Sequence, residues 1–173
     1  MKLKLFQINA FTDKMFSGNP ACVIPLKEWL PDELLLKIAK ENAVPETAFF
    51  VKKNNKIHLR WFTPEIEMDL CGHATLATAH CLKTILNYPK DRILFKTRSG
   101  DLTVLTKNDT YHLDLPSRMP IVSKLPEIIR ESLNIQPKEI YKSRDYLLVY
   151  DTEEDIANIK IDKQIFDQIN LDP

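Results

Sequence analysis

A glycine and a histidine ahead of an apolar segment are the first residues that point to chemistry. Cys71-Gly72-His73-Ala74 directly precedes a segment with helical composition. The first backbone N–H groups of a helix lack internal partners, and the helix dipole places partial positive charge there. Gly72 and Ala74 would therefore border a pocket for a substrate carboxylate, with His73 donating a proton or hydrogen bond. The alternative is a glycine turn into a core helix with a satisfied histidine, which the local sequence alone favours.

Glu46 is a second candidate, because it stands just ahead of the strongly apolar strand predicted at 47–52. A partly buried carboxylate there would have its pKa raised toward neutrality, as a general acid/base requires. The alternative is a solvated turn glutamate, which composition favours because most acids are exposed.

The cysteines offer a different chemistry. Cys71, at a helix start, could have a lowered pKa and act as an acid/base thiol. Cys22, in an apolar strand, and Cys81, in the middle of a helix, are predicted to be core residues. An odd number of widely spaced cysteines, behind an N-terminus too polar for a signal peptide, predicts no disulfides and a reducing cytoplasm. With four histidines and no CxxC or HxxxH spacing, no metal site is predicted.

Further residues are candidates by position alone. Asp13 and Asn19, in the first loop, could line a pocket. Glu65, Glu67 and Asp69 alternate with apolar residues, which predicts a strand with one wet face and a structural role for these acids. The chain has only three glycines, Gly18, Gly72 and Gly100, and each is predicted to sit where a side chain is not tolerated.

The elements that position these residues follow from hydrophobic periodicity. Residues 31–42 predict an amphipathic helix that opens with proline and acids. Residues 73–87 predict a buried central helix, because they are small or apolar almost all round. Strands are predicted at 3–10, 21–26, 47–52, 56–63, 93–97, 102–106 and 111–115, with a polar turn at 53–55. The sequence thus predicts an α+β first lobe over residues 1–117, a curved mixed sheet or barrel wrapped round the helix.

Residues 118–173 are predicted to form a partial second lobe. Pro116 and Pro120 mark the boundary, followed by a helix at 125–133, strands near 140 and 147–150, and a helix near 163–169. These elements carry too few apolar residues for a convincing core of their own.

Bulk composition excludes some partners. Lys+Arg and Asp+Glu both number 24, so the formal net charge is zero. Neither nucleic acid nor an anionic membrane is expected as a partner. No apolar run approaches the roughly 20 residues that span a bilayer.

Five motifs, in one order and with characteristic gaps, resemble the PhzF-like (phenazine-biosynthesis-like) family, relatives of diaminopimelate epimerase. They are Phe11-Thr12-Asp13, Phe16-Ser17-Gly18-Asn19-Pro20-Ala21, Pro45-Glu46-Thr47-Ala48-Phe49, Arg60-Trp61-Phe62-Thr63-Pro64 and Asp69-Leu70-Cys71-Gly72-His73-Ala74-Thr75-Leu76-Ala77. The resemblance implies two pseudo-symmetric lobes, each a sheet curled round a central helix, with the active site between them. It also implies isomerisation of a small carboxylate-bearing metabolite by moving a proton on carbon, without a cofactor.

The resemblance also assigns roles. Glu46 matches the family's general acid/base, and Gly72 and His73 match its first substrate-binding loop. Cys71 falls where the epimerase relatives keep one of two catalytic cysteines, and it ranks below Glu46. A two-cysteine racemase would need a second thiol, for which Cys22 is the spare candidate.

One family motif has no counterpart. Nothing in residues 118–173 resembles the Asp-Pro-x-Thr-Gly-Ser-Ala-His-like loop of the family's second lobe. Full activity is therefore expected to need that lobe, with a homodimer or a complementing second-lobe chain as partner. The alternative is a non-catalytic half-barrel remnant that self-associates or binds a small anion.

Overall fold

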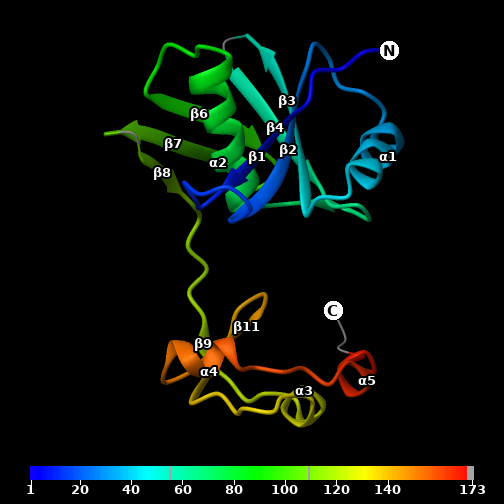
Figure 1. The fold of residues 1–173 in the computed structure, drawn as a ribbon, viewed down its shortest axis with the longest axis vertical. Coiled ribbons are helices and arrows are strands. Elements are labelled where there is room, and N and C mark those ends of the chain that lie inside the picture. Colours follow the sequence, from blue (N-terminus) through cyan, green and yellow to red (C-terminus); the bar gives the residue numbers. More distant parts are fainter. Residues whose placement is uncertain (55, 109, 171–173) are drawn as a thin grey trace. The chain divides into compact units, whose positions relative to one another are not determined.

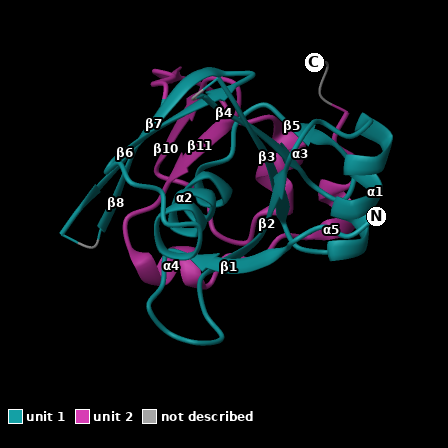
Figure 2. Ribbon diagram, turned by 90° about the horizontal axis from the view of Figure 1, so that it is seen from above, with its two compact units in different colours: residues 1–115 teal, residues 116–173 magenta. Residues whose placement is uncertain are grey.

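The computed structural model describes residues 1–54, 56–108 and 110–170. They form two compact units, of which the first is Met1–Leu115 and the second begins at Pro116 (Figures 1 and 2). The predicted boundary after residue 117 lies just beyond this division. The predicted turn at 53–55 includes residue 55, which is outside the described residues. Across the described part of the chain, no helix is long and apolar enough to cross a membrane.

The first unit is built on one curled mixed sheet. Its strands are β1 (Phe6–Ala10), β2 (Asn19–Leu26), β3 (Glu46–Lys53), β4 (Lys56–Phe62), β5 (Glu67–Met68), β6 (Arg92–Thr97), β7 (Gly100–Lys107) and β8 (Thr110–Asp114). They follow the order β1-β2-β3-β4-β6-β7-β8, with β5 paired to β4. The β2–β3 and β4–β6 pairs are parallel and the others antiparallel.

A central helix lies within the curve of this sheet (Figure 2). Helix α2 (Gly72–His80) packs against β1, β2, β3 and β8. Its small residues permit this close approach: Ala74, Ala77 and Ala79 are almost completely buried. The predicted α+β architecture, a curved mixed sheet around a buried helix, is confirmed.

The second half of the predicted central helix differs in geometry. From Cys81 to Ile85 the chain forms a π-helical turn, η1, in which the Leu86 N–H donates to the Cys81 carbonyl at 3.0 Å. Asn87, at a φ of 51°, then takes the chain out of the helix. An apolar pattern over five residues does not distinguish a π turn from an α turn, so the sequence gives no sign of it.

The opposite face of the sheet is covered by helix α1 (Asp32–Asn42). Leu35 and Ala39 on this helix pack with Phe49 and Val51 of β3. The intervening Phe50 belongs to the other core, against α2. Strand β3 is therefore buried on both faces, which explains why residues 48–51 form a continuous apolar run.

Arg60 fixes the segment that leads into α2. Its guanidinium donates two hydrogen bonds of 2.7 Å to the Glu67 carboxylate and one of 2.9 Å to Asp32 at the start of α1. Ser99 Oγ also donates to the Asp69 carbonyl at 2.7 Å. Glu67 thus has the predicted structural role and orients the turn that ends at Cys71, but its side chain is only 10% exposed and does not lie on the predicted wet face.

The second unit is small. Its elements are β9 (Ile121–Val122), α3 (Glu127–Ser132), β10 (Glu139–Lys142), β11 (Tyr146–Val149), α4 (Glu153–Ala157) and α5 (Lys163–Phe166). The three strands pair in the order β11-β10-β9. Among the described residues of this unit, Leu125, Ile129 and Leu133 form a buried apolar cluster, against which partly buried side chains pack. Helix α5 ends three residues before the predicted limit of 169, and α4 was not predicted.

Candidate active site

Strand alternation aims Glu46 at the central helix. Glu46 is the first residue of β3 and pairs with Ala21 of β2 in parallel register. Because side chains alternate along a strand, Glu46 shares a face with Ala48 and Phe50, which belong to the core around α2. Glu46 therefore points to the concave side of the sheet, where α2 begins.

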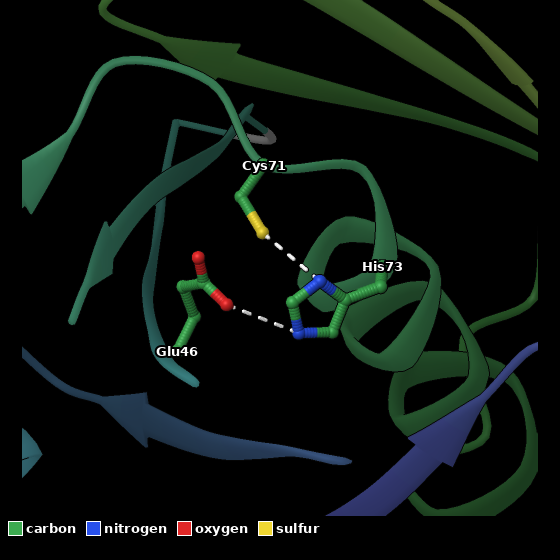
Figure 3. Close-up of side chains that lie close together, drawn as sticks. All are labelled: Glu46, Cys71 and His73. Atoms are coloured by element: carbon green, nitrogen blue, oxygen red, sulfur yellow. Dashed lines mark hydrogen bonds and ion pairs between the residues drawn. The ribbon is translucent and has the colours of Figure 1, made fainter. Parts of the chain in front are cut away.

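His73 meets this carboxylate. It lies in the first turn of α2, its side chain is only 9% exposed, and its Nε2 is 3.2 Å from Glu46 Oε2 (Figure 3). Its Nδ1 lies 3.5 Å from Cys71 Sγ. Among the described residues, Nε2 has no hydrogen-bond partner of good geometry, since the ring and the carboxylate are close but not aligned. The fold thus brings together the three residues that the sequence proposed as catalytic.

The prediction of a lowered pKa for the Cys71 thiol is wrong. The residue is 7% exposed, and this burial raises the pKa of its thiol to about 12. The negative charge of Glu46 adds to the rise, whereas hydrogen bonds from the backbone N–H groups of Ala74 and His73 oppose it. The helix start does act on the sulfur as predicted, but desolvation is the larger effect. At neutral pH Cys71 is therefore a thiol and not a thiolate.

Gly72 also departs from expectation. A Cβ added there would meet only Leu113 and Leu115, each at 3.9 Å, which is ordinary contact. The packing of the described residues therefore does not demand glycine at this position. What the missing side chain provides is open backbone at the first turn of α2, beside Ala74, which is completely buried.

Asn19 and Asp13 lie differently with respect to the three residues. Asn19 is half-buried at the start of β2, two positions before the partner of Glu46, so it occupies the same edge of the sheet. Asp13 is exposed in the preceding loop. No hydrogen bond or ion pair described in the structure joins Asp13 to Glu46, Cys71 or His73. Only Asn19 is positioned by the sheet to border the site.

Two threonines that sequence reasoning missed help to hold the site. Thr75 Oγ1 donates to the Cys71 carbonyl at 2.5 Å, which fixes the entry into α2. Thr47, completely buried beside Glu46, accepts a 3.1 Å hydrogen bond from Asn42 Nδ2 at the end of α1. The signal for Thr75 was its place four residues after Cys71, the spacing at which a hydroxyl bonds the preceding turn.

The arrangement supports two kinds of chemistry. A carboxylate beside an imidazole can accept, hold and return a proton, while the N–H groups at the helix start hold an anion. Carboxylate, thiol and imidazole are also metal-ligand types, and their ligand atoms all lie within 4.8 Å of one another.

Solved structures place the fold in a known class. The structure of a PhzF-family protein from Enterococcus faecalis matches with a TM-score of 0.88 and 38% identity, over 99% of this chain and 66% of that one. A protein described as a predicted epimerase from Pseudomonas aeruginosa, at 17% identity and a TM-score of 0.68, shares the fold over 94% of this chain and 65% of its own. The fold is thus that of the PhzF proteins and related epimerases, as predicted.

Sequence comparisons give the family itself. The model for "Phenazine biosynthesis-like protein" matches residues 8–156. A protein named as an uncharacterized isomerase of Pseudomonas aeruginosa is 46% identical over 162 residues, 94% of this chain and 62% of that protein. The chain belongs to the phenazine biosynthesis-like family. It spans 62%, 57% and 65% of the lengths of three curated bacterial relatives.

Proposed function

We propose that this chain carries one wall of the active site of a cofactor-independent isomerase, which moves a proton on carbon of a small carboxylate substrate. The observation that carries the proposal is the 3.2 Å approach of Glu46 Oε2 to His73 Nε2 in the first turn of α2. The isomerase names of two bacterial relatives support the same reaction class.

Glu46 acts as the base in this reaction. Its carboxylate takes a proton from carbon, and the electron pair of the C–H bond stays on the substrate as a delocalised carbanion. Backbone N–H groups around Gly72 and Ala74 hold the substrate carboxylate and stabilise the charge. The Glu46 carboxylic acid then returns the proton to a second carbon, with His73 orienting the acid and the ligand. One acid/base group is enough for such a shift between carbons, whereas inversion at one carbon needs a donor on the opposite face.

A two-thiol racemase is the less favoured reaction. Burial raises the pKa of both Cys22 and Cys71, the second to about 12. A thiol must be ionised to abstract a proton, and neither sulfur is readily ionised at neutral pH. The carboxylate is the better base.

We further propose that full activity needs a second wall. The chain covers 57% to 65% of three relatives' lengths, and residues 118–170 contain no Asp-Pro-x-Thr-Gly-Ser-like loop. A homodimer or a complementing second-lobe chain would supply the missing groups and exclude water. All three cysteines are free, in keeping with a reducing cytoplasm as the proposed setting.

Hydrogen exchange tests the reaction. The chain is incubated in D₂O with a panel of small unsaturated carboxylates, and deuterium incorporation is followed by NMR. We expect exchange by the native chain and none by Glu46→Gln, with the exposed Glu65→Gln as matched control. Exchange that survives in Glu46→Gln but disappears in Cys71→Ser would favour the thiol. No exchange with any substrate, by the chain alone or mixed with a complementing second-lobe chain, would favour the alternative of a non-catalytic remnant.

A further inference from the structure

Three ligand atoms from two separate elements converge at the start of α2. Glu46 comes from the first position of β3, whereas Cys71 and His73 come from the turn into the helix. Figure 3 shows the imidazole beside the other two side chains, with Nδ1 facing the Cys71 sulfur and Nε2 facing the Glu46 carboxylate. The ligand atoms of all three lie within 4.8 Å of one another. No sequence motif with metal-ligand spacing marks this set, because Glu46 lies on a different element from Cys71 and His73.

One ring nitrogen of His73 lacks a hydrogen bond. The His73 side chain is more than nine-tenths buried, and its Nε2 makes no hydrogen bond with the described residues. Its close contact is the Glu46 carboxylate, which forms an ion pair with the ring only when the ring is protonated. When the ring is neutral, Nε2 is a buried polar atom without a hydrogen bond, which destabilises the fold. Nε2 faces Glu46 Oε2 at 3.2 Å, so a cation bound by both atoms would satisfy the ring nitrogen and the carboxylate together.

The donor types select the class of that group. Thiolate sulfur, imidazole nitrogen and carboxylate oxygen are the ligands that Zn²⁺ uses, and three protein ligands leave a fourth position for water. In a tetrahedral zinc site, neighbouring ligand atoms are separated by roughly 3.5 Å, given the usual metal–ligand lengths. Glu46 Oε2 lies 3.2 Å from His73 Nε2, which is near this value. Cys71 Sγ lies 3.5 Å from the other ring nitrogen, Nδ1, so one side chain must move for both to share an ion with a single nitrogen.

We propose that Glu46, Cys71 and His73 bind one thiophilic divalent cation such as Zn²⁺. The ion takes one ring nitrogen of His73, a carboxylate oxygen of Glu46 and, after a rotamer change, the sulfur of Cys71. The S–H bond of Cys71 is replaced by a metal–sulfur bond and its proton goes to solvent, so affinity rises with pH. The structure thereby assigns a cation site where the sequence predicted none.

An occupied site is closed to acid/base chemistry. Glu46 cannot accept a proton from carbon while its oxygen is bound to the ion. Zinc would therefore inhibit the isomerase, and this consequence rests on the proposed function. Binding itself does not, because the three ligands are present whether or not the chain moves a proton.

Metal binding is tested directly on the full chain, without EDTA and with a non-thiol reductant. Zn²⁺ affinity is measured by competition with a chromophoric chelator, and Co²⁺ is added separately to record its absorption spectrum. We expect one equivalent of Zn²⁺, and a sulfur-to-cobalt charge-transfer band with the intense visible bands of a tetrahedral ion. Cys71→Ser should remove the charge-transfer band, and both Cys71→Ser and His73→Gln should weaken Zn²⁺ binding roughly tenfold or more.

Matched controls separate this site from other sulfur and nitrogen ligands. Cys81→Ala removes a buried thiol of the π-helical turn η1, and His112→Gln removes an exposed histidine of β8. Both should bind Zn²⁺ as the native chain does. The proposal is overturned if Zn²⁺ binds equally well to Cys71→Ser and His73→Gln, if the controls lose binding equally, or if no Co²⁺–thiolate band forms. Circular dichroism is used to check that each variant is folded. A chain that binds Zn²⁺ but exchanges no substrate hydrogen refutes only the isomerase.

Discussion

Glu46 and His73 lie 3.2 Å apart between Oε2 and Nε2, although one opens a strand and the other lies in the first turn of a helix. Two relationships produce this contact. The parallel pairing of β2 and β3 sets Glu46 opposite Ala21, and α2 packs on both strands. The position of the pair is therefore determined by the core, so small changes in that core should alter the distance between Glu46 and His73.

Replacing His73 with glutamine should lower the hydrogen-exchange rate by about 10²- to 10⁴-fold if the ring takes part in proton transfer. Glutamine keeps a polar side chain of similar reach but cannot act as an acid or a base near neutral pH. The measurement is the exchange rate by NMR, with His112→Gln as control because that histidine is exposed on β8. A rate within twofold of the native value would leave His73 with only a structural role.

Gly72→Ala should separate folding from ligand binding. The new methyl group would lie 3.9 Å from Leu113 and Leu115, without a clash, and alanine favours a helix by up to about 1 kcal/mol over glycine. We expect the free energy of unfolding to be unchanged or slightly higher, but exchange activity to fall because the methyl group covers the backbone that should hold the carboxylate. Denaturant unfolding and the exchange assay measure the two effects. Full activity in the variant would contradict the anion pocket.

Gly18→Ala should destabilise the chain. Gly18 has a φ of +81°, and a Cβ there would lie 2.4 Å from the Ala10 carbonyl oxygen, which is backbone and cannot move aside cheaply. We expect a loss of about 1–3 kcal/mol or more in the free energy of unfolding. Gly100→Ala is the matched control, since its φ is +94° but its added Cβ meets nothing within 4 Å. Equal losses in the two variants would show that backbone strain, and not the clash, is responsible.

Stability should fall in alkaline solution because of the buried thiols. Burial raises the pKa of Cys71 from 9.0 to about 12, so between these values the folded chain keeps a proton that the unfolded chain loses. The unfolded state therefore binds fewer protons, and stability decreases as pH rises, by up to about 1.4 kcal/mol per pH unit for one thiol. Below pH 9 this contribution is fully present.

Denaturant unfolding at several pH values above 9 measures this slope. Cys71→Ala should flatten the decline but not abolish it, because burial also raises the pKa of Cys81, to about 11, and that of Cys22. A slope equal to that of the native chain would show that Cys71 is ionised in the folded state.

Much of the first unit was accessible from the sequence, because each local signal agrees with the packing. Pro31 and the following acids mark the start of α1, and the small residues after Gly72 mark a helix that is enclosed. The roles of Glu46 and His73 came from motif resemblance, and local composition favoured plainer alternatives for both. What the sequence could not supply is their separation, which depends on strand register and helix packing.

Other features were missed for identifiable reasons. Helix α4 rests on a capping box between Thr152 and Asp155 and has no buried residue, so hydrophobic periodicity gives no sign of it. The predicted direction of the Cys71 pKa shift was wrong, because the desolvation that raises this pKa depends on neighbours distant in sequence. The metal-ligand set was missed for the same reason, since Glu46 joins Cys71 and His73 only in three dimensions.

The double burial of β3 has a consequence for how this lineage can change. Phe49 and Phe50 pack into cores on opposite faces of the sheet. Inserting or deleting a single residue between Glu46 and Val51 would therefore turn the side chains on one side of the change to the opposite face. The carboxylate would then turn away from His73 at the same moment that both cores were disrupted. Natural selection for a stable fold therefore also preserves the position of Glu46, even in descendants whose substrate has changed.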